Sequence, residues 1–173
     1  MIKGFKFGDI TDPSNRRHII IGMNTTLKDV TGIGLPYVAK LKTVLEHPLE
    51  LGSVLSFHFD YGRDLHMIFC HNIGIGGWEK ADQYVRFGLD YLHHTDGDKG
   101  EFSIVQIGAG DVGVRDGADP VAIHTAMANS FLPVTLFLKD PRVKTGVVGE
   151  TPKEMVAYAT WHPHYGEQHL SVQ

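Results

Sequence analysis

The sequence predicts an α/β sandwich in which helices cover a largely buried sheet. Short runs of β-branched and aromatic residues alternate along the chain with segments whose apolar residues recur at helical spacing. This alternation is typical of α/β domains, and apolar runs without polar alternation are typical of strands covered on both faces. The length of 173 residues fits one domain. The 42% hydrophobic and 21% charged residues are ordinary for a soluble globular protein.

The first quarter of the chain is predicted to hold two strands, a glycine loop and a helix. The stretch KGFKFGDI forms a strand that ends in the turn TDPSN, and RHIIIGMN (residues 17–24) forms a buried strand. The loop that follows contains Gly32 and Gly34. A helix is predicted over Leu35–His47, because its apolar residues share one face and Pro36 suits its first turn.

Two further strands and a helix occupy the middle of the chain. Strands are predicted over GSVLSFHFD and over Arg63–Asn72, with a hairpin-like turn at Tyr61-Gly62 between them. A second glycine loop, IGIGGW, comes next. The segment Glu79–His94 then places its apolar residues on one side of a helix.

The last third begins with the strand FSIVQI. A helix over GADPVAIHTAMANSFL follows, with Pro120 near its start, and a strand over Pro133–Leu138 comes after it. From Lys139 onward the regular pattern weakens. We therefore expect one domain over residues 1–138 and an extension over residues 139–173, which either packs on the domain or forms an arm.

Glycine-rich loops follow three of the predicted strands, around Gly32 and Gly34, around Gly74–Gly77, and around Gly108–Gly113. Glycine lets backbone N–H groups approach phosphate oxygens closely, often beside the start of a helix. In an open α/β sheet such loops gather at the carboxyl ends of the strands, where ligands bind. Each loop alone is also explained as a turn, but the three together favour a phosphate-bearing ligand.

The third loop contains Gly108-x-Gly110-x-x-Gly113, the glycine pattern of a dinucleotide-binding Rossmann unit. In this alternative Asp140, at the end of the following strand, would bind a ribose. A Rossmann domain, however, usually opens with this motif, whereas here it begins after residue 100 and a weakly patterned tail follows. A non-catalytic interaction module, whose glycine loops are only turns, is the third possibility.

The order of the motifs resembles that of a divergent macro domain, the ADP-ribose-binding family. The stretch GDIT (Gly8–Thr11) resembles the opening motif of the family, and IIIGMN…TGIG resembles its strand, asparagine and first glycine loop. The segment MIFCHNIG resembles the next strand and loop, and IGAGDVGV (Ile107–Val114) resembles the diphosphate loop. The resemblance spans about residues 2–138 and implies a three-layer α/β/α sandwich with a mixed central sheet.

The resemblance also implies a binding site for ADP-ribose or a related ADP-ribosyl metabolite. The side chain of Asp9 would accept from the adenine amino group, Asn24 would stand near the distal ribose, and the third loop would hold the diphosphate. A carboxylate can accept from an amine, and glycine loops can donate to phosphates, so these residue types suit the chemistry. The expected ligand-binding residues are Asp9, Ile10, Asn24, Gly32, Gly34, Gly108, Ala109, Gly110, Val112 and Gly113.

The chain departs from the family at its catalytic acids. One hydrolytic branch carries an aspartate shortly after the first glycine loop, where this chain has Gly34-Leu35-Pro36. Another carries one at the position of Val112, and here Asp111 stands one residue earlier. The candidate catalytic residues are therefore Asp111 and His71, of an ADP-ribosyl hydrolase or an ADP-ribose 1″-phosphate phosphatase. Asp111 is equally explained as a turn cap, and for His71 the favoured interpretation is a structural histidine, which leaves a pure binder open.

No cofactor and no metal site are assigned. His162-x-His164 with His169 could converge on zinc, but no cysteine or tight acidic motif accompanies them. The partner expected is a small ADP-ribose-type ligand or an ADP-ribosylated target. The net charge of −4 disfavours nucleic acid, and no apolar stretch is long enough for a membrane span. The single cysteine, Cys70, and the absence of a signal-like N-terminus favour the cytoplasm.

Overall fold

The structure is a computed structural model that describes residues 1–15, 18–45, 47–59, 63–72, 77–144, 146, 148 and 156–168. The strands are β1 (Ile2–Lys6), β2 (His18–Asn24), β3 (Val54–Phe59), β4 (Arg63–His71), β5 (Phe102–Val105), β6 (Val134–Phe137), β7 (Val156–His162) and β8 (Gly166–Gln168). The helices are the 3₁₀ helix η1 (Gly32–Tyr37) and the α-helices α1 (Val38–Val44), α2 (Ala81–Asp96), α3 (Asp111–Asp116) and α4 (Pro120–Asn129).

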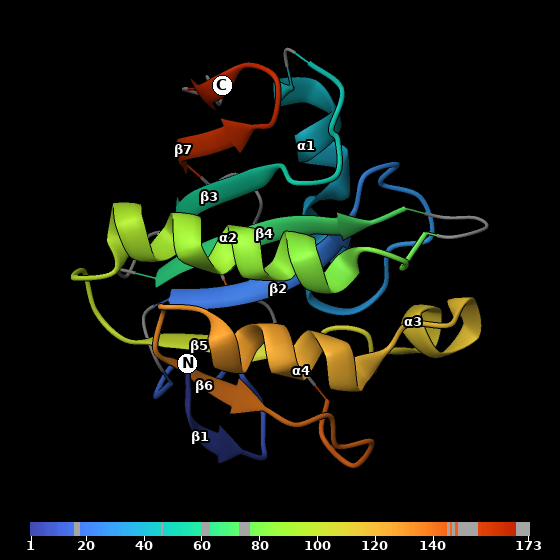
Figure 1. Ribbon diagram of the computed structural model, residues 1–173, viewed down its shortest axis with the longest axis vertical. Helices are drawn as coiled ribbons and strands as arrows, with labels where there is room; N and C mark the ends of the chain where they lie inside the picture. Colours follow the sequence, from blue (N-terminus) through green and yellow to red (C-terminus); the bar gives the residue numbers. More distant parts are fainter. Residues whose placement is uncertain are drawn as a thin grey trace.

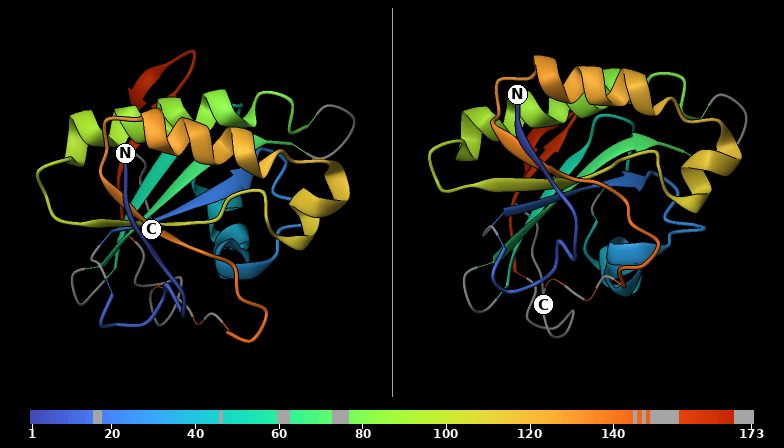
Figure 2. Two further views of the ribbon diagram at one scale, coloured as in Figure 1. Left: turned by 60° about the horizontal axis from the view of Figure 1, so that its bottom comes forward. Right: turned by 90° about the horizontal axis from the view of Figure 1, so that it is seen from below.

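The described strands form one mixed sheet in the order β1-β6-β5-β2-β4-β3-β7-β8 (Figure 1). The five strands from β1 to β4 in this order run parallel to one another. The pairs β4-β3, β3-β7 and β7-β8 are antiparallel. Helices α2 and α4 cover one face of the sheet, and η1 with α1 covers the other (Figure 2).

The central strand β2 shows why these apolar runs become buried strands. Successive side chains of a strand point to opposite faces. Ile19 and Ile21 therefore join the core with Tyr37 and Leu41, on the side of η1 and α1. Ile20 joins the other core, which contains the apolar side of α2. Because helices cover both faces, the strand is apolar without a polar alternation.

The expected strands and the helices over 79–94 and 117–132 are present, with shifted ends. The helix expected over Leu35–His47 differs, because the chain first forms η1 with Pro36 inside it, and α1 begins only at Val38. Leu35, expected on the buried face, is 55% exposed. Leu35 belongs to η1, whose tighter turn does not follow the 3.6-residue spacing from which the buried face was predicted.

Three described elements have no counterpart in the sequence prediction: α3, β7 and β8. Helix α3 has only six residues, too few for a helical pattern to stand out. Strands β7 and β8 lie within the expected extension 139–173, and β7 pairs with β3. The expected turn at Tyr61-Gly62, residues 73–76 of the second glycine loop and His169 lie outside the described residues.

Within the described part of the chain, every helix is too short or too polar to traverse a lipid bilayer.

Gly88 lets α2 approach the sheet closely. A Cβ atom at this position would lie 2.7–2.9 Å from three side-chain atoms of Ile68 on β4. Both residues are fully buried or nearly so in the core beneath α2. Because the overlap involves both Cγ atoms as well as the Cδ1 atom, a change of the terminal rotamer alone would not remove it.

We expect Gly88→Ala to lower the free energy of unfolding by up to about 2 kcal/mol. The overlap with Ile68 costs about 1–3 kcal/mol, whereas alanine gains about 1 kcal/mol over glycine in helix propensity. In an Ile68→Ala background the overlap is gone, so the same change should be neutral or stabilising. Urea unfolding of the four proteins of this cycle measures the coupling. Stabilisation by Gly88→Ala in the unaltered chain would contradict the close packing.

Candidate functional site

A cavity of about 380 Å³ lies at the carboxyl ends of β2, β4, β5 and β6. Its size falls within the range of about 300–1,000 Å³ that is usual for small-molecule sites. The loops that follow these parallel strands meet there, as expected for an open α/β sheet. The lining residues are Gly8, Ile10, Ile21–Asn24, Asp29–Gly34, His71, Trp78, Val105–Gly108, Gly110, Val112, Gly113, Phe137–Pro141 and Val143.

Most of the residues proposed from the sequence lie on the wall of this cavity. Those that line it are Ile10, Asn24, Gly32, Gly34, His71, Gly108, Gly110, Val112 and Gly113. Asp9, Ala109 and Asp111 are not among the lining residues. Nine of the twelve residues proposed from the sequence thus line the cavity, and three do not.

The third glycine loop has a conformation that requires glycine. Gly108 has φ +89°, a left-handed conformation that other residues rarely adopt. A Cβ atom on Gly113 would overlap the carbonyl oxygen of Gly108, so the loop folds tightly onto the start of α3. The first N–H groups of a helix have no partner within it. Val112 and Gly113, which belong to this first turn, line the cavity.

The loop after β2 is held by Asn24 and contains two strained residues. The side-chain amide of Asn24 donates to the carbonyl of Lys28 at 2.6 Å and accepts from the hydroxyl of Thr26 at 2.7 Å. Leu27 has φ 58° and Asp29 has φ 55°, both left-handed without being glycine. Such strain persists where the surroundings fix it, often beside functional sites. The amide of Asn24 thus shapes the loop that borders the cavity.

Asp9 sits beside the cavity and organises the turn after β1. One carboxylate oxygen accepts from the backbone N–H of Thr11 at 2.9 Å and from its hydroxyl at 2.6 Å. The other accepts from the backbone N–H of Gly146 at 3.3 Å. This other oxygen accepts one bond and can accept a second. The carboxylate therefore keeps accepting capacity next to Gly8 and Ile10, which line the cavity.

His71, at the end of β4, is a buried neutral histidine on the cavity wall. Its ring stacks on Trp78 with the ring centres 3.8 Å apart. Burial lowers the pKa of His71 to about 4, an effect that Asp116 partly offsets. At neutral pH the imidazole is therefore uncharged and has a lone pair, so it suits a base better than an acid. Burial also raises the pKa of the neighbouring Cys70 thiol to about 12, which makes a thiolate nucleophile unfavourable.

Asp111 does not accompany His71 in the cavity. It is the first residue of α3, and its side chain is 96% exposed. Its carboxylate lies 3.4 Å from the ammonium group of Lys139, which itself lines the cavity. The structure therefore separates the two candidate catalytic residues and makes Asp111 the partner of a cavity lysine.

Asp140, the ribose-binding candidate of the Rossmann alternative, is engaged by its neighbour. Its carboxylate accepts from the backbone N–H of Arg142 at 3.0 Å and from the Nε and Nη2 groups of that arginine, each at 2.9 Å. The glycine motif also follows β5, which lies between β2 and β6, and not the first strand of the chain. These features do not support a minimal Rossmann domain.

The sequence analysis missed several residues of the cavity. Trp78 and Lys139 follow predicted strands and Phe137 lies near the end of one, so the rule that ligands bind at strand ends could have identified them. The link between Arg115 and Asp29, at 2.6 Å, joins α3 to the loop after β2. No sequence signal indicates this pair, because its partners are far apart in the chain. As an exposed pair it contributes little stability, but it ties together two walls of the cavity.

No family model and no curated protein matches the sequence. Solved structures do match. The macrodomain of Thermus aquaticus DarG has a TM-score of 0.50 and 14% identity, over 82% of this chain and 99% of that chain. A structure described as alphavirus P23pro-zbd has a TM-score of 0.51 and 12% identity, over 80% of this chain. The chain spans only 22% of the length of that viral protein.

At these identities the likeness concerns the fold. It agrees with the mixed sheet and its two helical layers, so the predicted three-layer α/β/α class is confirmed. The resemblance derived from the motifs is confirmed at the same level: the chain is a divergent protein of macro-domain fold.

Proposed function

We propose that this protein binds ADP-ribose or a related ADP-ribosyl metabolite in the cavity at the strand ends. The observation that carries the proposal is the convergence of two glycine loops on one cavity of suitable size. The macro fold, which typically binds ADP-ribose, supports the same ligand class. The ligand would arrive free or as a modification on a target protein.

The third glycine loop is the best candidate for the diphosphate. Gly108, Gly110, Val112 and Gly113 line the cavity, and the last two belong to the first turn of α3. Backbone N–H groups in this arrangement favour phosphate oxygens. Lys139 adds a positive charge on the wall, which a phosphate could engage in place of Asp111.

The adenine end is assigned to the turn after β1. Asp9 provides an acceptor for the adenine amine, as the motif GDIT suggests. Ile10 and Phe137, which are apolar, also line the cavity. Ile10 comes shortly after β1 and Phe137 is in β6, and these two strands are paired. A base edge would thus meet a carboxylate, and its faces would meet apolar atoms.

The distal ribose is assigned to the part of the cavity between the loop after β2 and the pair His71 and Trp78. Gly32, Gly34 and the Asn24 loop supply the polar backbone of this part. The neutral imidazole of His71 is the specific feature that favours a second function, hydrolysis, because it could take a proton from an attacking water. Asp111 gains no such support from its solvent-exposed position. The cytoplasmic location remains a prediction.

Titration calorimetry with ADP-ribose tests the binding proposal, with NAD and AMP as comparison ligands. We expect a Kd in the micromolar range, about −8 kcal/mol. Gly113→Ala should weaken it at least ~10-fold, because the new Cβ displaces the Gly108 carbonyl and loses hydrogen bonds to a charged group. Gly4→Ala is the matched control, since a Cβ there meets nothing within 4 Å. Absence of ADP-ribose binding to the unaltered chain would refute the proposal.

The pair of variants Asp9→Asn and Asp140→Asn separates the macro-type site from the Rossmann alternative. In Asp9→Asn the amide oxygen can keep both bonds from Thr11, while an NH₂ group faces the base and repels its amine. We expect affinity for ADP-ribose to fall about 10-fold. Asp140→Asn should bind within about twofold of the unaltered chain. Equal affinity in Asp9→Asn with a loss in Asp140→Asn would favour the Rossmann alternative.

If the protein hydrolyses ADP-ribose 1″-phosphate, the pH profile reports on His71. A base must be unprotonated, and a pKa of about 4 keeps His71 so from pH 5 upward. The rate should therefore fall only as the pH drops towards 4, and stay level from pH 5.5 to 8 as far as this group is concerned. His71→Phe, which keeps a ring against Trp78, should lower kcat at least ~100-fold while retaining binding. Asp111→Asn is the control and should keep its rate; full activity in His71→Phe would exclude the histidine as base.

A further inference from the structure

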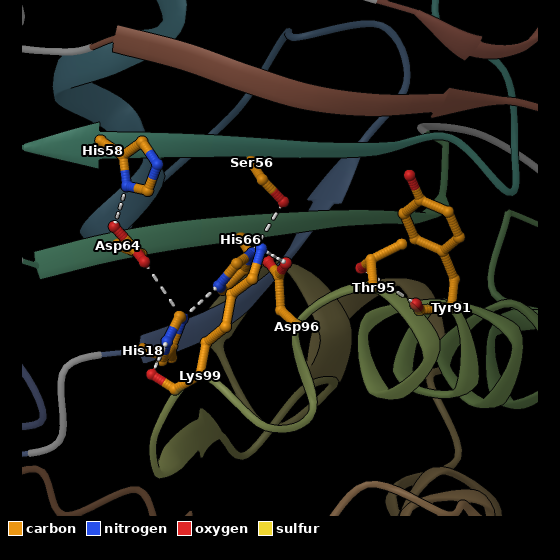
Figure 3. A network of polar contacts seen from close by, with 9 residues as sticks. All are labelled: His18, Ser56, His58, Asp64, His66, Tyr91, Thr95, Asp96 and Lys99. Atoms are coloured by element: carbon orange, nitrogen blue, oxygen red, sulfur yellow. Dashed lines mark hydrogen bonds and ion pairs between the residues drawn. The ribbon is translucent and has the colours of Figure 1, made fainter.

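A second cluster of polar side chains, shown in Figure 3, gathers around the first residue of β2. His18 is the first residue of β2, and its register partner on β4 is Asp64. His66 follows two residues later on β4, on the same face. The side chains of His18, Asp64 and His66 are at most 1% exposed. Since β2 has seven residues, about 20 Å of strand separates this cluster from the cavity end at Asn24.

Three potential ligand atoms converge in this cluster. The Nδ1 atom of His18 lies 2.9 Å from Nε2 of His66 and 3.3 Å from Oδ2 of Asp64. All three atoms lie within 4.8 Å of one another, which no other group of three or more such residues achieves in the described part of the chain. Two ligands of a tetrahedral zinc ion, each about 2.0–2.1 Å from the metal, lie about 3.3 Å apart.

The outward-facing atoms of the same side chains are already hydrogen-bonded. The Nε2 atom of His18 lies 3.2 Å from the carbonyl oxygen of Lys99. A carbonyl can only accept, so Nε2 carries the proton and Nδ1 of a neutral ring has the lone pair. The Nδ1 atom of His66 lies 2.7 Å from the hydroxyl of Ser56, so Nε2 of this ring can offer its lone pair as well.

These outer contacts have the form of a metal site's supporting shell. A metal-bound histidine usually donates its other N–H to a carbonyl, carboxylate or similar acceptor, and a bound carboxylate is itself hydrogen-bonded. Here the acceptors are the Lys99 carbonyl and the Ser56 hydroxyl, and the second oxygen of Asp64 contacts Nδ1 of His58. The Nδ1 atom of His18, the Nε2 atom of His66 and the Oδ2 atom of Asp64 thereby face one another.

The surroundings also favour a cation. The cluster lies beneath the C-terminal end of α2, where the helix dipole is negative. Asp96, the last residue of α2, is 2% exposed and pairs with Lys99 at 3.0 Å. The carboxylate of Asp64 brings a negative charge into the inner group, which suits a bound cation.

We propose that His18, Asp64 and His66 bind one zinc ion that fastens β2 to β4. Two imidazole nitrogens and one carboxylate oxygen are ligands that zinc accepts readily, and a solvent molecule would complete four-coordination. The ion is structural, because the site is enclosed and lies at the end of the sheet away from the cavity. This revises the expectation of a chain without a metal, and it is independent of the ADP-ribose proposal.

Metal content is the first test. The full chain is produced with zinc in the medium, desalted and measured by mass spectrometry of the elements. We expect about one zinc per chain. Asp64→Asn should lose it, whereas His164→Gln should retain it. His164 is the matched control because the sequence analysis considered it, with His162 and His169, as a zinc ligand. Its side chain is 68% exposed.

Affinity and spectra keep the proposal testable if Asp64→Asn fails to fold. The side chain of His58 is 41% exposed, so His58→Gln should fold while it removes the support of Asp64. Zinc affinity, measured by competition with a chelator, should fall about 10–100-fold. Cobalt bound to the unaltered chain should give visible absorption bands of a four- or five-coordinate ion, and His58→Gln should change them.

Two results would overturn the proposal. One is a chain that contains no zinc and whose urea midpoint is the same after refolding with zinc or with a chelator. A proton shared by His18 and Asp64 would then hold the cluster together. The other is zinc binding that is lost in His164→Gln, while Asp64→Asn and His58→Gln bind zinc as the unaltered chain does.

Discussion

The parallel pairing of β2 with both β4 and β5 is the constraint on which the rest of the structure depends. Parallel neighbours cannot be joined by a tight turn, so the chain must cross over through helices, and these cover both faces of the sheet. Parallel strands also end at a common edge, which brings loops from distant parts of the sequence together. The cavity exists because β2, β4, β5 and β6 all end there.

The same pairing gives β2 two different ends. Its middle residues, Ile19–Ile21, are apolar and buried, whereas His18 and Asn24 at its two ends are polar and equally buried. A buried polar group is costly unless it is bonded, and each end meets this need in its own way. Asn24 bonds to the loop that borders the cavity, and His18 contacts Lys99, Asp64 and His66. The strand thus connects a site for a ligand with a cluster suited to a metal.

Local patterns in the sequence were enough to predict the six strands from β1 to β6 and nine of the residues that line the cavity. Glycine positions such as Gly108 and Gly113 could be read because only glycine tolerates that conformation and that close approach. Side-chain direction could not be read in the same way. Asp111 stands next to the loop in sequence, but as the first residue of α3 it extends into solvent. A shift of one residue along a helix turns a side chain by about 100°, which no glycine motif specifies.

The histidine cluster escaped the sequence analysis for a related reason. His18 and the pair Asp64 and His66 are separated by more than forty residues, and only the register of β2 on β4 brings them together. His162 and His164 were considered for zinc because only one residue separates them in the sequence. In the structure His164 pairs with Glu50 at 2.8 Å, and His162 contacts the carbonyl of Pro48 at 3.1 Å. Register between distant strands, rather than spacing along the chain, decides where ligands converge.

The chemistry of the cavity follows from how it is enclosed. Burial against Trp78 keeps His71 uncharged at neutral pH. Burial of Cys70 keeps its thiol protonated, so it is not a thiolate nucleophile. The charged groups beside the cavity are largely paired with one another: Lys139 with Asp111, Arg115 with Asp29, and Asp140 with Arg142. Such a site offers backbone donors and shape rather than strong acids or nucleophiles. Recognition of a diphosphate is therefore the demand it meets best, and any hydrolysis would depend on one neutral imidazole and on water ordered by the ligand itself.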